Sequence, residues 1–372
     1  MEWRAVSEIA RGEGLKTVAE IALSQLSRVA LGEQLLAHYA AGAGGRIEDE
    51  RLRVAVAGVE FENPVLVGAG WDKKGRAIRG LHALGFAGVE VGTVLPFPQP
   101  GNPRPRLWTI DGAQHSVGFN RLGYNSPGAE AVGRYLTSFA SDDFPIGLNV
   151  GKNKLLPNNQ APWAHAHVIE QLGAHASYVV LGISSPNTTD LRGLQDKAPL
   201  RDNLQAAQGA ISNLGKPVPL FVKIDPERTP QELDDIIEVI VEENAAGVVA
   251  TNTYSGSDLK AIYGVRWTHQ DGGLSGADPG FRKRAIATVR YMYENAGDRL
   301  AIIGAGGIDS AATALNMMRA GASAVQVVTA MRPSRGKVAA QINKGFLAHL
   351  NQEGIGSLKE LVGAGTQRGP RT

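Results

Sequence analysis

The sequence predicts an α/β protein, a (β/α)8 TIM barrel with an N-terminal helical extension. From about residue 62 onward, one unit recurs eight times: a short apolar run that ends in Gly, Asn, Ser or Thr, followed by a helix-like stretch. The runs are continuously apolar rather than alternating, which is typical of parallel strands buried on both faces. Eight such units over about 290 residues match the size of a (β/α)8 barrel. A doubly wound open sheet is the structural alternative.

Residues 1–50 form the predicted extension, and residues 51–372 form the barrel. Apolar residues recur with a helical period from Leu15 to Tyr39, and the segment ends in the linker-like string AAGAGG. One interpretation is a helix packed on the barrel; the other is an interfacial helix that contacts a membrane through residues 15–40. The N-terminus lacks the layout of a signal peptide, and no run of 18 apolar residues exists. We therefore expect a cytoplasmic protein, with peripheral contact with the inner face of the cell membrane as the alternative.

The eight predicted strands follow from the apolar runs. They are Pro64–Gly70, Gly88–Val94, Ile146–Gly151, Tyr178–Ser185, Pro219–Asp225, Gly247–Thr253, Leu300–Gly307 and Ala324–Ala330. Between several of them lie helical patterns, such as Asp309–Ala320 and Pro230–Asn244. Thr229 is a candidate cap for the second of these, and its apolar face consists of Leu233, Ile236, Ile237 and Ile240.

Two strand-to-helix connections are unusually long. Residues 95–133 and 254–280 are rich in Pro, Gly and Asn, and both follow a predicted strand. Long loops in compact domains are usually lids or binding segments. In a barrel they would lie at the C-terminal ends of the strands, where such enzymes keep their active sites.

Composition and charge exclude several classes of function. The chain has 46 glycines and no cysteine, so disulfides, thiolate zinc sites, iron–sulfur clusters and cysteine-based catalysis are excluded. Its net charge of +2 is too balanced for a general nucleic-acid binder. No HxH, HExxH or carboxylate cluster is present, so we expect no catalytic metal. The histidines His165, His167 and His175 lie in helix-like or polar stretches and are predicted to be surface residues.

Polar residues follow the predicted strands and are candidate ligands. They are Asp72, Lys73, Asn149, Ser184, Ser185, Asn187, Thr188, Lys223, Asn252, Thr253 and Thr329. Lys223 lies between Val222 and Ile224, where a bare ammonium would be costly, so we expect it to meet an anion or an electron-rich ring. The asparagines could instead form turns, Lys73 could be solvated, and Asp72 could cap a helix. With no GxSxG elbow, Ser185 is not an acyl-transfer nucleophile.

A glycine-rich turn predicts a phosphate site. Gly304–Ile308 reads GAGGI and opens a helix after the seventh strand, where free backbone amides attract phosphate. It lacks the third glycine of the dinucleotide fingerprint. Together with Thr329 after the eighth strand, it predicts a cofactor that carries phosphate.

Several strings resemble the dihydroorotate dehydrogenases, flavin enzymes of pyrimidine biosynthesis, and most closely their quinone-dependent class 2. The similarity runs from Asn63 to about Leu350. The strings are GAGWDKKG (68–75), VGTVLPFPQPGNPRPRL (91–107), GFNRLGYNSPG (118–128), GLNVGKNK (147–154), ISSPNT (183–188), VKIDPE (222–227), ATNT (250–253), GGLSG (272–276) and IIGAGGIDS (302–310). PQPGNPRPRL and SSPNT are specific to the family, whereas GAGG alone is not.

The resemblance implies FMN as the cofactor and a dihydroorotate-like pyrimidine as the substrate. FMN would be bound by Ala69, Gly70, Thr93, Asn149, Lys223, Thr251, Ser275, Gly276, Gly306, Gly307, Val328 and Thr329. The pyrimidine and its carboxylate would be bound by Lys73, Asn120, Asn187, Asn252 and Thr253. Amide side chains suit this task because each offers both a donor and an acceptor.

The resemblance also implies a mechanism. In the family a base takes a proton from C5 of dihydroorotate while hydride leaves C6 for the flavin. Class 1 uses a cysteine as this base and class 2 a serine; because the chain has no cysteine, Ser185 occupies the base position. Thr188 matches the relay threonine, and Tyr124 lies near the base. The electrons would pass to a quinone beneath the extension of residues 1–50.

Two departures from the family pattern leave other functions open. Gly182 stands where the family usually has an asparagine that contacts the pyrimidine, and Tyr124 stands where it has a phenylalanine. The alternative function is therefore a diverged FMN-dependent paralogue that acts on another unsaturated or cyclic amide. A non-catalytic flavin-binding scaffold at a membrane is the third hypothesis.

Overall fold

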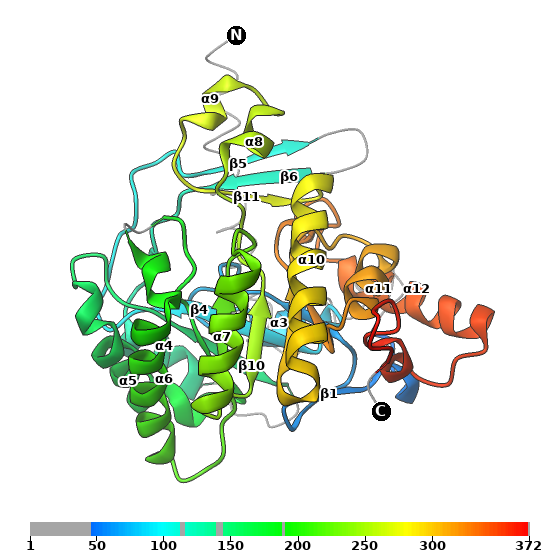
Figure 1. Cartoon of the computed structure of the whole chain (residues 1–372), viewed down its shortest axis with the longest axis horizontal. Coiled ribbons are helices and arrows are strands. Elements are labelled where there is room, and N and C mark those ends of the chain that lie inside the picture. Colours follow the sequence, from blue (N-terminus) through cyan, green and yellow to red (C-terminus); the bar gives the residue numbers. More distant parts are fainter. Residues whose placement is uncertain (1–45, 112–115, 139–143, 188–189, 371–372) are drawn as a thin grey trace.

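Eight parallel strands close into a barrel in the computed structural model, which describes residues 46–111, 116–138, 144–187 and 190–370 (Figure 1). The order around the barrel is β10-β12-β13-β3-β4-β7-β8-β9. The strands are β3 (Val65–Val67), β4 (Gly88–Val94), β7 (Ile146–Val150), β8 (Tyr178–Leu181), β9 (Leu220–Ile224), β10 (Gly247–Ala250), β12 (Ala301–Ala305) and β13 (Ala324–Val327). Each lies within one of the eight predicted runs, so the barrel is confirmed and the open sheet is wrong.

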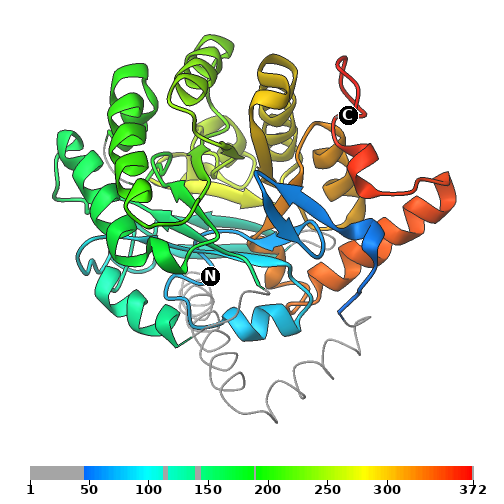
Figure 2. The same ribbon diagram turned by 90° about the horizontal axis from the view of Figure 1, so that it is seen from below.

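Helices surround the strands, as the view along the barrel shows (Figure 2). They are α3 (Ile78–Ala83), α4 (Ala129–Thr137), α5 (Ala161–Leu172), α6 (Lys197–Ser212), α7 (Pro230–Glu242), α10 (Pro279–Ala296), α11 (Ala311–Arg319) and α12 (Val338–Glu353). Short 3-10 turns lie at Glu50–Leu52, Asn158–Gln160, Gly173–His175, Leu191–Gln195, Gly297–Arg299, Thr329–Met331 and Leu358–Leu361. Because the helices cover the outer face, the barrel strands are buried on both sides, which explains their continuous apolarity.

The start of α7 illustrates how the sequence sets a helix boundary. The Thr229 side chain accepts a hydrogen bond from the Glu232 amide, and Glu232 in turn accepts one from the Thr229 amide. This reciprocal pair satisfies two amides that have no partner within the helix. The four apolar residues predicted for its inner face are all buried. The other predicted helix, Asp309–Ala320, begins at Ala311, because Ser310 caps it.

A short hairpin closes the N-terminal end of the barrel. Strands β1 (Val54–Val56) and β2 (Val59–Phe61) pair antiparallel and lie across the end that faces the viewer in Figure 2. Phe61 packs in one cluster with Leu66, Tyr178 and Phe221 from the barrel strands. Three-residue strands are too short to produce a periodic pattern, which is why sequence analysis did not predict this hairpin.

The two long connections fold together above the C-terminal end of the barrel. They contain β5 (Leu107–Asp111), β6 (Ser116–Asn120), β11 (Gly273–Gly276), α8 (Ser257–Ala261) and α9 (Val265–Thr268). The strands pair antiparallel in the order β11-β6-β5, and Figure 1 shows this sheet and the two helices at the top. Phe119 stacks on Trp267 with ring centroids 4.2 Å apart. We call the described residues of this unit, 107–111, 116–120 and 254–276, the cap. Its place was predicted, but its strands were not.

Two further sequence predictions need comment. His165 is not a surface residue: its side chain is 0% exposed within α5. It lies on the buried face of α5 with Ala161, Ala164 and Val168. Its neighbours in the sequence are largely apolar and gave no sign of a buried polar side chain. Residues 1–45, which contain most of the predicted extension, lie outside the described residues. Within the described ranges, no helix is long and apolar enough to cross a bilayer.

Candidate functional site

A cavity of about 650 Å³ lies between the C-terminal ends of the barrel strands and the cap. Its volume is in the range of sites that hold cofactors and drug-sized ligands. Every residue to which the family resemblance gave a role lines it, except Thr188, which lies outside the described residues. These are Ala69, Gly70, Lys73, Thr93, Asn120, Tyr124, Asn149, Ser185, Asn187, Lys223, Thr251, Asn252, Thr253, Ser275, Gly276, Gly306, Gly307, Val328 and Thr329.

One end of the cavity is lined by backbone rather than by side chains. Gly306 and Gly307 have φ of +123° and +72°, and a Cβ on Gly306 would lie 2.7 Å from the Cβ of Ala285. Their amides have no hydrogen-bond partner within the described ranges. The Arg282 Nε atom holds the turn by donating to the Gly307 carbonyl over 2.8 Å. Two adjacent free amides before a helix form a recess that suits an anion such as phosphate.

Hydroxyl groups continue this recess. The Thr329 hydroxyl donates to Ser275 Oγ over 3.0 Å, which ties the eighth barrel strand to the cap. Gly276 beside it has φ of +83°, and a Cβ there would lie 2.8 Å from Thr329 Cγ2. Glycines therefore shape this end of the cavity, and replacing one by a larger residue would require the neighbouring side chains to move.

The floor of the cavity carries a hydrogen-bonded group of four buried side chains from four strands. Glu90 Oε1 accepts from Lys223 Nζ over 3.1 Å and from Asn149 Nδ2 over 2.7 Å. Gln326 Nε2 donates to Glu90 Oε2 over 2.5 Å, and Gln326 Oε1 accepts from Lys223 over 3.2 Å. We call Glu90, Asn149, Lys223 and Gln326 the floor network. The anion expected beside Lys223 is thus a side chain of the protein.

Sequence analysis missed Glu90 and Gln326, although a signal was present. Each is a polar residue inside an apolar run, GVEVGTV and AVQVVTA, as Lys223 is in its own. The cost of burying a lone polar group, which singled out Lys223, applies equally to these two.

Ser185 lies beside Tyr124 on one wall. It is 5% exposed, and its Oγ accepts from the Asn187 amide over 3.2 Å. The Tyr124 hydroxyl donates to the Gly182 carbonyl over 2.5 Å. Burial raises the pKa of Tyr124, and hydrogen bonding with Ser185 and Thr93 offsets only part of the rise. Tyr124 therefore stays protonated and acts as a donor.

Gly182 has no room for a side chain in this arrangement. A Cβ there would lie 2.6 Å from Asn149 Oδ1 and 2.9 Å from the Val150 carbonyl. The Thr93 hydroxyl donates to the same Asn149 oxygen over 2.6 Å. The space next to Gly182 is thus filled by the residues of the floor and by the Tyr124 hydroxyl.

Three asparagines converge beside Ser185. Asn187 Nδ2 donates to Asn120 Oδ1 over 3.1 Å, and Asn252 Nδ2 donates to Ser184 Oγ over 3.0 Å. The Asn187 Oδ1 atom is buried with no hydrogen-bond partner within the described ranges. A buried acceptor without a partner is costly, so it is suited to a donor on a ligand.

The charges around the cavity favour anionic ligands. Lys73, Lys223, Arg332 and Arg335 line it, and none of its described lining residues is Asp or Glu. Asp72, the other candidate after the first strand, does not reach the cavity: it is 1% exposed and accepts from the Ala77 amide over 2.8 Å. It therefore caps the turn before α3. In the described part of the chain, no group of three or more His, Asp or Glu is placed to hold a metal ion.

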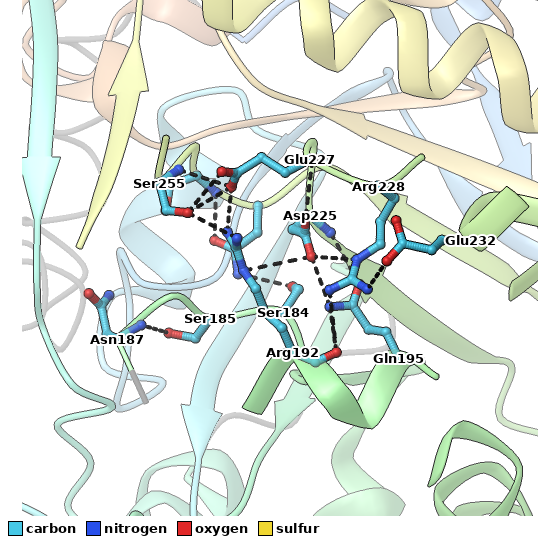
Figure 3. Close-up of polar contacts among 12 residues, drawn as sticks. Ser184, Ser185, Asn187, Arg192, Gln195, Asp225, Glu227, Arg228, Glu232 and Ser255 are labelled. Atoms are coloured by element: carbon cyan, nitrogen blue, oxygen red, sulfur yellow. Dashed lines mark hydrogen bonds and ion pairs between the residues drawn. The ribbon is translucent and has the colours of Figure 1, made fainter. Parts of the chain in front are cut away.

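An ionic cluster behind the cavity joins three loops. Figure 3 shows Arg192, from the loop that also carries Ser185, reaching both Glu227 and Ser255, which also bind each other. Arg192 Nη2 lies 2.7 Å from Glu227 Oε2, and Nη1 donates to Ser255 Oγ over 2.9 Å. Glu227 follows β9, and it also accepts from the Ser255 amide over 3.0 Å. We call Arg192, Glu227 and Ser255 the loop clamp, because they connect the loops after β8, β9 and β10.

Comparison with known proteins gives one consistent result. The model of the dihydroorotate dehydrogenase family matches residues 51–350. The chain is 38% identical over 320 residues to a dihydroorotate dehydrogenase (quinone) of Anaeromyxobacter dehalogenans, covering 86% of each protein. It is 39% identical over 308 residues to the protein of the same description from Chloroflexus aurantiacus, covering 82% of this chain and 84% of that one.

Solved structures give the same result. The crystal structure of ligand-free dihydroorotate dehydrogenase from Eimeria tenella is similar with a TM-score of 0.79 and 34% identity, covering 90% of this chain and 98% of that one. The complex of the Eimeria tenella enzyme with ferulenol has the same TM-score at 32% identity, covering 89% and 93%. Both similarities extend over about nine tenths of this chain.

Proposed function

The chain belongs to the dihydroorotate dehydrogenase family, and we propose that its cavity holds FMN beside the pyrimidine, with Ser185 as the base. It is an oxidoreductase that acts on a CH–CH bond. It oxidises dihydroorotate to orotate, a step of de novo pyrimidine biosynthesis, with a quinone as the electron acceptor. The use of FMN, the role of each residue and the contact with a membrane are the parts that we propose.

The residues around the cavity fit FMN. The free amides of Gly306 and Gly307, with Val328 and Thr329, would hold the phosphate, and the recess that they form excludes bulkier side chains. Ala69, Gly70, Thr93, Asn149, Lys223, Thr251, Ser275 and Gly276 would surround the ribityl chain and the ring. When bound, FMN supplies the redox chemistry, accepting hydride from the substrate and passing electrons to the quinone.

The cluster of asparagines beside Ser185 fits a planar pyrimidine that carries a carboxylate. Asn120, Asn187 and Asn252 offer donors and acceptors, and the buried Asn187 Oδ1 atom, which no described residue contacts through a hydrogen bond, would accept from a ligand N–H. Thr253 lies beside them, and Lys73 supplies a positive charge for the carboxylate. This convergence of three amides and an ammonium next to Ser185 is the observation that carries the proposal.

Ser185 would take the proton from C5 of dihydroorotate as hydride leaves C6. A serine hydroxyl is a weak base, so its own proton must move on, and Thr188 is the proposed relay. Tyr124 cannot serve as the base, because burial raises its pKa and its hydroxyl is engaged with Gly182. We propose that Tyr124 holds the main chain next to Ser185 in place.

The N-terminal segment would connect the cavity to the membrane. We propose that residues 1–50 form the quinone-access extension and that residues 15–40 contact the inner face of the cell membrane peripherally. The apolar side chains of Trp71, Leu84 and Met331 line the same cavity as the polar site and would offer an apolar path for a quinone.

The test compares the FMN-loaded wild type with Ser185→Ala under anaerobic conditions. We expect L-dihydroorotate to bleach the flavin absorbance of the variant about 10²–10⁴-fold more slowly, because general base catalysis contributes about that much. FMN content and re-oxidation by quinone should not change. Ser212→Ala, a serine on α6 away from the cavity, is the matched control. Bleaching of Ser185→Ala at the wild-type rate would contradict the assignment of the base.

A further inference from the structure

We propose that Glu90 is a positioning residue that sets the electrical charge beneath the flavin ring. This inference rests on the proposed binding of FMN above Lys223 and Asn149, and it concerns a residue that does not itself line the cavity. Glu90 lies on β4 and is 0% exposed. Among the four members of the floor network it is the only carboxylate, and the other three all donate to it.

Glu90 determines which way the two neighbouring amides point. Asn149 and Gln326 both turn their NH2 groups toward its carboxylate. As a result the Asn149 oxygen accepts from Thr93, and the Gln326 oxygen accepts from Lys223. A carboxylate accepts hydrogen bonds but donates none, so no other arrangement satisfies all three donors at once.

Glu90 also balances most of the positive charge of Lys223. The Lys223 Nζ atom lies 3.1 Å from Glu90 Oε1, and both groups are shielded from solvent. Charges interact strongly at such a distance inside a protein. Burial raises the pKa of Tyr178 behind the network, and the neighbouring Glu90 carboxylate raises it further. A ligand on the floor thus meets an ion pair instead of a bare ammonium.

The expected consequence concerns the preference for the reduced cofactor. Reduced FMN carries more negative charge than oxidised FMN, so a more positive floor binds the reduced form more tightly. Glu90→Gln keeps the size and removes the charge. We expect the ratio of the dissociation constants of oxidised and reduced FMN to rise about tenfold, which is a positive shift of about 30 mV for a two-electron couple.

The experiment measures the reduction potential of the bound flavin by titration against a reference dye. It uses the full-length holoenzyme as wild type, Glu90→Gln, Glu90→Asp and Glu60→Gln. Glu60 is exposed on β2, so this control removes the same charge at the opposite end of the barrel. We expect a positive shift in Glu90→Gln, a smaller one in the same direction in Glu90→Asp, and none in Glu60→Gln. Fluorescence of FMN on titration with apoprotein gives the affinity for the oxidised form separately.

The outcomes separate the two claims. An unshifted or more negative potential in FMN-loaded Glu90→Gln, or an equal shift in Glu60→Gln, would overturn the role of Glu90 and leave the proposed function intact. If Glu90→Gln does not fold, an unshifted potential in Glu90→Asp overturns it in the same way. A wild type that binds no FMN would overturn the proposed function, and this inference with it.

Discussion

Gly182 and Tyr124, the two residues that sequence analysis singled out as departures from the family pattern, are in contact with each other. The Tyr124 hydroxyl donates to the Gly182 carbonyl, and the space at Gly182 would not admit a Cβ without movement of Asn149 or Val150. The two positions are therefore coupled: Gly182 leaves no room for a side chain, and the Tyr124 hydroxyl binds the main chain at the same place. The sequence alone placed both residues near the base, but it did not indicate that they touch.

This contact can be tested at the level of one hydroxyl group. We expect Tyr124→Phe to lower the free energy of unfolding by about 1–3 kcal/mol, because it leaves a buried carbonyl without its donor. Urea denaturation of the two proteins measures the difference. Tyr135→Phe, at a partly buried position on α4, is the control and should change stability less. Equal free energies of unfolding for Tyr124→Phe and wild type would show that this hydrogen bond does not stabilise the fold.

Site residues could be predicted from the sequence where burying their polar side chain without a partner would be costly. Lys223 was found because it is a charge inside an apolar run, and the structure confirms that it is buried. The predicted anion beside Lys223 is present, and it is the carboxylate of Glu90, a residue that sequence analysis did not name. Single-sequence reasoning could not pair them, since the two residues are 133 positions apart. The same holds for Thr93 and Asn149, which meet only after the barrel closes.

At the scale of elements, the loop clamp fixes the loop that carries Ser185 to the loop that carries Asn252. Arg192 follows Ser185 in the chain, Ser255 follows Asn252, and Glu227 binds both. Asp225, which is 1% exposed, also holds the loop that carries Ser185, because its carboxylate accepts a hydrogen bond from Gln195 Nε2 over 2.9 Å. These are contacts among side chains outside the cavity, yet they set the distance between the proposed base and the proposed substrate contacts.

We therefore expect Arg192→Met to slow flavin reduction by dihydroorotate about tenfold to hundredfold, because small displacements of catalytic groups have effects of that size. Re-oxidation by quinone should keep its wild-type rate. Arg192→Lys should recover part of the loss. Arg201→Met, which removes an exposed ion pair on α6, serves as the control. Equal slowing of both half-reactions by Arg192→Met would point to a general loss of structure instead.

The elements differ in how well the sequence predicted them. The eight barrel strands and α7 were predicted because long apolar runs and a capping pair are local signals. The cap strands were not, because β5 and β6 lie in a stretch rich in Pro and Gly and pair with β11, which is 153 residues away along the chain at the Asn120–Gly273 pair. A sheet assembled from two distant loops leaves no periodicity in either of them.

At the scale of the whole molecule, one buried histidine makes stability depend on pH. Burial lowers the pKa of His165 to about 4, and the positive charge of Lys152 adds to the lowering. The unfolded chain has the ordinary value, so between about pH 6.5 and pH 4 it binds a proton that the folded protein does not. Stability is unaffected above this window and falls as the pH is lowered through it.

The predicted loss is about 3 kcal/mol from this residue, since the shift spans about two and a half units. Denaturant unfolding at pH 7, 6, 5 and 4 measures it, and His165→Leu should show a correspondingly flatter profile. His269→Leu, at an exposed position, should keep the wild-type slope. Parallel profiles for His165→Leu and wild type would contradict the assignment.

The N-terminal extension is the other whole-molecule question. If residues 1–50 provide access for the quinone, their deletion should abolish quinone-linked turnover while flavin reduction by dihydroorotate continues. Stopped-flow measurement of each half-reaction separates the two effects. Retention of both activities, including activity with quinone in vesicles, would remove the extension from the mechanism.

The central claim is that this cavity brings FMN and dihydroorotate together at Ser185. The most direct measurement is anaerobic mixing of the purified, FMN-loaded wild type with L-dihydroorotate, followed by flavin absorbance and by quantification of the orotate formed. We predict complete bleaching, with one orotate produced for each flavin reduced. FMN that remains oxidised in the presence of saturating dihydroorotate would contradict the account.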